Sequence, residues 1–102
     1  MQVIGVIGAG QMGAGIAQVA AQNGYSVLLS DIDIERAEAA KVAISAGLRR
    51  LEDRGRLEGI SAQDAEGRIT PITGCGAFRE ASLVIEAATE REAVKVSIYL
   101  RR

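Results

Sequence analysis

Three glycines near the start of the chain have the G-x-G-x-x-G spacing of a phosphate-binding turn: Gly8, Gly10 and Gly13. In such turns the first glycine allows a tight turn off a strand, the second lets the main chain approach a pyrophosphate, and the third lets a helix pack against the strand. The helix that follows offers free N–H groups and the positive end of its dipole, so no basic side chain is needed, and residues 8–24 contain none. The remaining residues of this predicted binding turn are Ala9, Gln11 and Met12. A glycine turn that binds nothing is the alternative.

An acidic residue completes the pattern of a dinucleotide site. Asp31 follows an apolar run and lies 18 residues after Gly13, close to the spacing expected for a carboxylate that binds the adenine ribose. Its charge would oppose the 2′-phosphate of NADP by about 4 kcal/mol at a separation of ~4 Å and an effective dielectric constant of ~20. The next arginine in the chain is Arg36. The predicted cofactor is therefore NAD and not NADP. The alternative for Asp31 is an acid at a helix N-terminus or in a solvated turn.

The two arrangements that usually supply the base in a hydride transfer are missing from the sequence. The chain has no histidine, the usual base for oxidising an alcohol near neutral pH. The other familiar arrangement, a tyrosine with a lysine four residues later, is missing as well, because Leu29 follows Tyr25 at that spacing and Tyr99 lies too near the end. The single cysteine, Cys75, is interpreted as a spare thiol in a reducing compartment. The sequence thus predicts the cofactor-binding half of an oxidoreductase without catalytic residues.

The patterns around these residues predict alternating strands and helices. Apolar runs predict strands, and apolar residues at three- and four-residue steps predict helices. The first helix is expected to pack through Met12, Ile16, Val19 and Ala20. The first half of the chain is predicted to form a strand over residues 3–7, a helix ending before Gly24, a strand over 26–30 and a long helix to about residue 55. A short helix from Ser61 to about Gly67 follows, and then strands over 68–73 and 83–88. The last predicted element is a helix capped by Thr89 with Glu92.

This order of elements predicts an α/β fold, a Rossmann-type doubly wound parallel sheet with the strand order 3-2-1-4. Pro71 cannot donate to a strand ladder, which places the third strand at an edge. Residues 1–102 are interpreted as one domain, truncated because a full fold of this type continues past the fourth strand. The open edge of that strand is expected to favour association between chains.

The overall composition argues against several other classes of function. A net charge of −1, few aromatic residues and no basic stripe argue against nucleic-acid binding. No apolar run reaches the ~18 residues of a membrane span, and the N-terminus lacks the basic segment of a secretory signal. The expected setting is therefore the cytoplasm, with no membrane partner.

Three stretches together resemble the NAD-binding domain of the 3-hydroxyacyl-CoA dehydrogenases, which include bacterial 3-hydroxybutyryl-CoA dehydrogenases. They are residues 6–17, residues 27–31 and the segment Leu83-Val84-Ile85-Glu86-Ala87-Ala88-Thr89-Glu90, and the resemblance runs from Val3 to Tyr99. It implies an oxidoreductase of fatty acid metabolism that oxidises an L-3-hydroxyacyl-CoA to a 3-ketoacyl-CoA, with hydride transfer to NAD. The expected substrate is 3-hydroxybutyryl-CoA.

The resemblance also implies roles for individual residues. Besides supporting the roles of the glycine turn and of Asp31, it places Glu90 and Lys95 at the cofactor. Arg54 stands where the family has a basic residue that meets the phosphates of coenzyme A.

The resemblance further implies parts that this sequence lacks. The family's catalytic histidine, its glutamate partner and the helical domain that forms the homodimer lie beyond the end of the chain, which alone is predicted to be inactive. Two alternatives stay open: a non-catalytic, redox-sensing dinucleotide-binding module, and a dehydrogenase of the 3-hydroxyisobutyrate and 6-phosphogluconate group, which shares Gly-x-Gly-x-Met-Gly. Asp31 and the long second helix argue against that group.

Overall fold

The computed structural model describes residues 2–74, 76–90 and 93–100, which fold into one sheet with helices packed on it. The strands are β1 (Val3–Ile7), β2 (Ser26–Asp31), β3 (Ile69–Thr73), β4 (Leu83–Glu90) and β5 (Ala93–Leu100). The helices are α1 (Gln11–Gln22), α2 (Ile34–Asp53) and α3 (Ala62–Gly67), with a 3-10 helix, η1, over Gly76–Glu80. Within these described residues no helix combines the length and the apolar character needed to cross a membrane.

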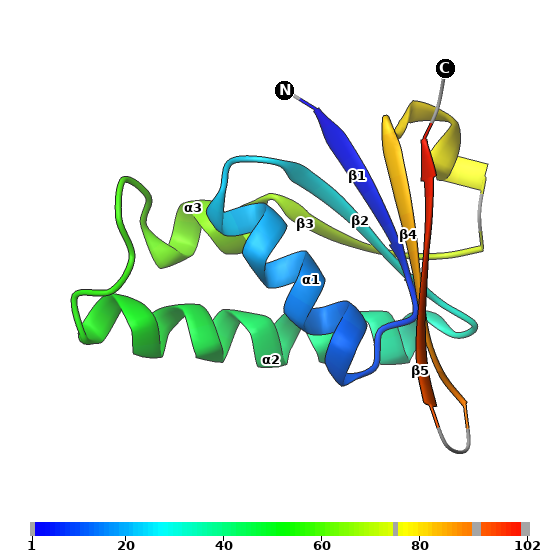
Figure 1. Ribbon diagram of the computed structural model, residues 1–102. Coiled ribbons are helices and arrows are strands. Elements are labelled where there is room, and N and C mark those ends of the chain that lie inside the picture. Colours follow the sequence, from blue (N-terminus) through cyan, green and yellow to red (C-terminus); the bar gives the residue numbers. More distant parts are fainter. Residues whose placement is uncertain (1, 75, 91–92, 101–102) are drawn as a thin grey trace.

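The sheet has the strand order β3-β2-β1-β4-β5 (Figure 1). The predicted order 3-2-1-4 and the Rossmann-type α/β class are confirmed, with the first four strands parallel to one another. β3, which contains Pro71, is an edge strand as predicted. Because β2 and β4 lie on opposite sides of β1, the chain reverses its direction across the sheet at β1, and such a switch point is where ligands bind in open α/β sheets.

The predicted last helix is wrong, because β5 stands in its place and runs antiparallel to β4. Thr89, expected to cap a helix, pairs with Val94 in the β4–β5 hairpin, and Glu92 lies outside the described residues. Residues 94, 96, 98 and 100 are all apolar, and this two-residue period favours a strand over the helix that the capping pattern suggested. The sheet is therefore mixed, and β5 covers the edge of β4 that was expected to be open.

Helix α1 packs unusually close to the sheet, and the face predicted for it is wrong in part. Its buried residues are Gly13, Ala17, Ala20 and Ala21, whereas Met12 is 39% and Val19 is 59% exposed. A Cβ atom on Gly13 would overlap the carbonyl oxygen of Gly8, so only small residues fit beneath the helix. The larger apolar residues are turned to its flank, where they line a groove of about 660 Å³. The residues around this groove are Ile4, Met12, Gly15, Ile16, Val19, Ala20, Asn23 and Tyr25.

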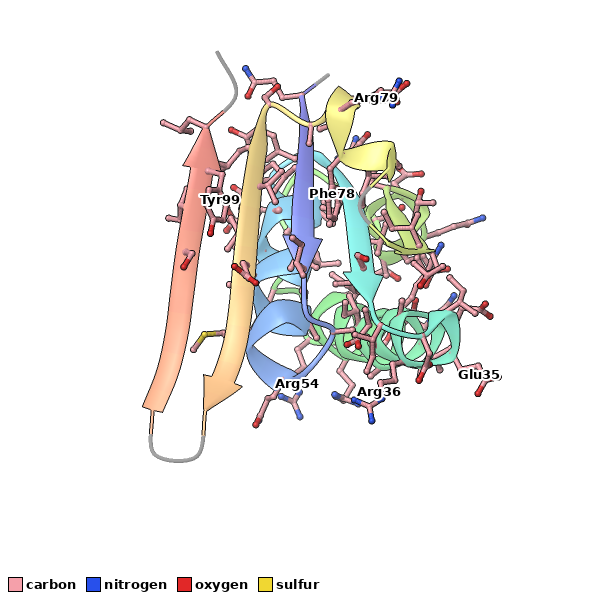
Figure 2. All side chains as sticks on the ribbon, turned by 90° about the vertical axis from the view of Figure 1, so that its right-hand side faces the viewer. Glu35, Arg36, Arg54, Phe78, Arg79 and Tyr99 are labelled. Carbon is pink, nitrogen blue, oxygen red and sulfur yellow. The ribbon has the colours of Figure 1, made fainter. Side chains whose placement is uncertain are left out.

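The two faces of the sheet are covered differently. Helices α1, α2 and α3 lie on one face, and η1 lies on the other (Figure 1). Figure 2 shows Phe78 of η1 over that second face, where it packs so tightly on β1 that a Cβ atom on Gly5 would lie 2.6 Å from the Phe78 ring. On the first face α2 buries Ala37, Ile44 and Leu48, as its apolar spacing predicted.

Candidate functional site

The turn after β1 can be made only with glycine at two positions. Gly8 has φ +100, a region that L side chains rarely adopt, and its N–H donates to the carbonyl oxygen of Ser30 at 2.8 Å. A Cβ atom there would overlap the carbonyl oxygen of Ala87 in β4. Together with the close approach of Gly13 to Gly8, these contacts fix the start of α1 against the carboxyl end of β1.

Gly10, the second glycine of the turn, is glycine for a different reason. Gly10 is the N-cap of α1 and has φ −70, which any residue can adopt, and a Cβ atom on it would meet no protein atom within 4 Å. No side chain caps this helix end among the described residues, so the N–H groups of Gln11 and Met12 stay free for a partner. The open space beside Gly10 leaves room for a ligand to approach these N–H groups, and a side chain at this position would occupy that space.

Asp31 lies beside this turn, at the carboxyl end of β2. Its Oδ2 accepts a hydrogen bond from the N–H of Ala9 at 2.8 Å, and its Oδ1 accepts one from the N–H of Ile32 at 2.6 Å. A carboxylate has about four lone-pair sites, so both oxygens can still accept hydrogen bonds from sugar hydroxyls. The structure thus brings the predicted phosphate-binding turn and the predicted ribose-binding acid into direct contact.

A cleft of about 340 Å³ opens at the same edge of the sheet, beside Asp31. It is lined by Ile7, Gly8, Ser30, Asp31, Ile32, Thr73 and Gly74. No motif in the sequence marks Ser30, Ile32, Thr73 or Gly74 as site residues. All four lie at or just after the carboxyl ends of β2 and β3, and parallel strands bring such positions to one edge, which is the signal that could have found them.

Arg54, by contrast, is not brought to this edge of the sheet. Arg54 is the C-cap of α2, a helix of 20 residues that begins near the cleft and is about 30 Å long at 1.5 Å per residue. Figure 1 shows α2 leading away from the strand ends, so Arg54 lies far from the turn. For Glu90 and Lys95 the structure describes only the backbone: Glu90 ends β4, and Lys95 pairs with Ala88.

The chemistry of the site suits a dinucleotide more than a purely apolar ligand. The turn offers free N–H groups to phosphates, Asp31 offers a carboxylate to a ribose, and the cleft offers Ile32, 85% exposed, to a ring. Among the described residues no group of three or more His, Cys, Asp or Glu side chains could hold a metal ion. The larger groove beside α1 has Asn23 and Tyr25 as the polar side chains of its lining, and no charged side chain lines it.

Comparisons of the sequence with known proteins agree with this geometry. The chain is 43% identical over 99 residues to 3-hydroxyadipyl-CoA dehydrogenase of Escherichia coli K12, covering 97% of the chain and 21% of that protein. It is 40% identical over 95 residues to a probable 3-hydroxybutyryl-CoA dehydrogenase of Deinococcus radiodurans, covering 93% of the chain and 34% of that protein. The chain therefore spans between a fifth and about a third of the length of these relatives.

The fold is shared with solved structures of the same kind of enzyme. A crystal structure of 3-hydroxybutyryl-CoA dehydrogenase from Escherichia coli K12 matches with a TM-score of 0.81 and 46% identity, over 88% of this chain and 19% of that one. The enzyme from Ralstonia eutropha matches with a TM-score of 0.80 and 33% identity, over 89% of this chain and 32% of that one.

A family model also matches almost the whole chain. It describes the NAD binding domain of 3-hydroxyacyl-CoA dehydrogenase and covers residues 3–101. This match confirms both the resemblance and the predicted cofactor, and it favours the 3-hydroxyacyl-CoA class over the 3-hydroxyisobutyrate and 6-phosphogluconate group. The family match agrees with the glycine turn, the acidic residue after β2 and the strand order of the sheet. The chain belongs to the 3-hydroxyacyl-CoA dehydrogenase NAD binding domain family, and its cofactor is NAD.

Proposed function

We propose that the turn from Gly8 to Gly13 binds the pyrophosphate of NAD through main-chain N–H groups, and that Asp31 accepts hydrogen bonds from the adenine ribose. One observation carries this proposal. The Ala9 N–H donates to Oδ2 of Asp31 at 2.8 Å, so the phosphate-facing turn and the ribose-facing carboxylate are held as one unit. The cleft beside Asp31 would take the adenine ring. Bound NAD supplies the hydride acceptor, and the residues of this chain hold and orient it.

We further propose that this domain serves a longer enzyme that oxidises a 3-hydroxyacyl-CoA to a 3-ketoacyl-CoA with NAD. The names of the similar proteins support the thioester class of the substrate, with 3-hydroxybutyryl-CoA as the first compound to test. In that enzyme Glu90 and Lys95 are proposed to lie at the cofactor, and the exposed Arg54 is proposed to meet coenzyme A phosphates. A homodimer and a cytoplasmic location belong to the same proposal, the second because a lone cysteine suits a reducing compartment.

The 102-residue chain by itself is expected to bind NAD but to form no NADH when 3-hydroxybutyryl-CoA is added. The reason is that the sequence contains no histidine to take the hydroxyl proton as the hydride leaves. NADH fluorescence in the presence of both ligands measures this directly, with a full-length 3-hydroxybutyryl-CoA dehydrogenase as the positive control. NADH formation that depends on both the chain and the thioester would contradict the expectation.

The Asp31→Asn variant is expected to bind NAD about 10- to 100-fold more weakly than the unaltered chain, because a charged hydrogen bond to the ribose is lost. Its preference for NAD over NADP should fall by more than this factor, because the negative charge that opposes a 2′-phosphate is lost as well. Isothermal titration calorimetry with each dinucleotide measures both effects.

A neighbouring acid provides the matched control. Asp33 caps α2 by accepting from the N–H of Arg36 at 2.9 Å, and asparagine caps helices as well as aspartate does. Asp33→Asn therefore removes the same charge two residues away without loss of the cap, and its NAD affinity should stay within about twofold of the unaltered chain. If the unaltered chain bound NADP as tightly as NAD, the role assigned to Asp31 would be wrong.

A further inference from the structure

Ser30 is a buried polar residue near the carboxyl end of β2. It lies in β2 between Leu29, which is fully buried, and Asp31, and only 3% of its own surface is exposed. Burying a hydroxyl is unfavourable unless the hydroxyl is hydrogen-bonded, and an alanine would fit the core at this position without that requirement. The hydroxyl of Ser30 therefore calls for an explanation beyond packing.

The carbonyl oxygen and the hydroxyl of Ser30 form hydrogen bonds with opposite walls of the cleft beside Asp31. Its carbonyl oxygen accepts from the N–H of Gly8 at 2.8 Å, which fixes the wall formed by the glycine turn. Its hydroxyl donates to the carbonyl oxygen of Gly74 at 2.8 Å, which fixes the wall formed by the end of β3. Both Gly8 and Gly74 line the cleft.

The bond to Gly74 holds a part of the wall that the sheet itself does not hold. The β2–β3 ladder ends at the pair Asp31 and Thr73, and Gly74 follows with φ +76, where the chain turns away from the strand. The Thr73 hydroxyl donates to the carbonyl oxygen of Asp31 at 3.2 Å, which strengthens the last rung. Beyond that rung, the Ser30 hydroxyl ties the Gly74 carbonyl back to β2.

We propose that Ser30 is a positioning residue for the adenosine half of NAD: its hydroxyl sets the separation of the Gly74 wall from the glycine turn. The inference rests on the function proposed above and adds a determinant of adenosine affinity to it. Ser30 touches neither phosphate nor sugar in this account. It acts through the position of Gly74. Loss of the Ser30 hydroxyl should therefore weaken the binding of ligands that contain adenosine and leave the binding of pyrophosphate unchanged.

The test compares three ligands on the full 102-residue chain: NAD, AMP and inorganic pyrophosphate. Ser30→Ala is expected to lower the affinities for NAD and AMP equally, by about three- to tenfold, which is the net contribution of one hydrogen bond. Its affinity for pyrophosphate should stay within about twofold of that of the unaltered chain. Ser30→Thr keeps the hydroxyl and should restore AMP affinity. Should Ser30→Ala fail to fold, Ser30→Cys keeps the size and a weak donor, and the same selective loss is expected from it.

A second serine supplies the matched control. Ser45 donates its hydroxyl to the carbonyl oxygen of Lys41 at 2.9 Å within α2, away from the cleft, so Ser45→Ala removes the same kind of bond. Its affinity for all three ligands should match that of the unaltered chain. A merely structural role for Ser30 would lower the melting temperature and weaken all three ligands alike, and that result would overturn the inference.

The outcomes separate this inference from the function on which it rests. If the unaltered chain binds NAD and Ser30→Ala binds AMP equally well, the role of Ser30 is refuted and the proposed function stands. If the unaltered chain binds no NAD, both are refuted. Selective loss of AMP and NAD affinity, restored by Ser30→Thr, supports both.

Discussion

The Gly10→Val variant is expected to bind NAD at least about 100-fold more weakly than the unaltered chain and to keep its fold, a loss equal to two or more hydrogen bonds to a charged group. Gly10 has a φ of −70, and a Cβ atom on it meets no protein atom within 4 Å, so valine is tolerated by the protein itself. The same side chain would fill the space through which the pyrophosphate approaches the N–H groups of α1. Valine is a poorer N-cap than glycine and should cost about 1 kcal/mol of stability, so a 100-fold loss of binding with no greater loss of stability would identify this space as the ligand site.

The matched control for this variant lies in the same helix. Gly15 is exposed, and a Cβ atom on it also meets nothing within 4 Å. The Gly15→Val variant should bind NAD as the unaltered chain does, because Gly15 lies about one turn along α1 from the free N–H groups of Gln11 and Met12. Calorimetry measures the affinities and circular dichroism the melting temperatures. Equal NAD affinity for Gly10→Val and the unaltered chain would refute the proposed binding turn.

The Gly13→Ala variant is expected to lose about 3 kcal/mol of unfolding free energy, at the upper end of the usual cost of overpacking. The added methyl group would overlap the carbonyl oxygen of Gly8, and neither backbone segment can yield easily. Gly8 is fixed by its bond to Ser30, and Gly13 is fixed within α1. For a chain of this size the melting temperature should fall by about 10–20 °C.

Urea unfolding followed by circular dichroism measures that change, and Gly15→Ala is its control. Alanine is the better helix former, so Gly15→Ala should gain up to about 1 kcal/mol in the same helix. A Gly13→Ala variant as stable as the unaltered chain would show that α1 can move away from β1, and the close helix–strand packing would then not constrain the turn.

The sequence was sufficient to predict the parts of the fold and site that local rules control. The glycine spacing predicted the turn, and the distance from Gly13 to Asp31 predicted that the acid would reach it, as the Ala9–Asp31 bond shows. The order of elements predicted the sheet order through right-handed crossovers. Pro71 predicted an edge strand, and Ser61 predicted the cap of α3, where its hydroxyl accepts from the N–H of Asp64 at 3.0 Å.

Features set by tertiary contacts could not be predicted in the same way. The two-residue apolar period of residues 94–100 favours a strand, whereas the capping pattern at Thr89 favours a helix. Pairing with β4 stabilises the strand, and the sequence alone does not show that pairing. The buried face of α1 follows from how closely Gly13 approaches Gly8, which turns Met12 and Val19 outward. The cleft walls at Ser30 and Gly74 are 44 residues apart in the sequence and meet only because β2 and β3 are neighbours.

A backbone amide NMR titration of the chain with NAD tests the central claim most directly. The largest chemical-shift changes are expected on Gly10, Gln11 and Met12, whose N–H groups are proposed to meet the phosphates, with further changes at Asp31 and Ile32. Binding with its largest changes in the apolar groove around Val19 and Tyr25, or no change at saturating NAD, would contradict it.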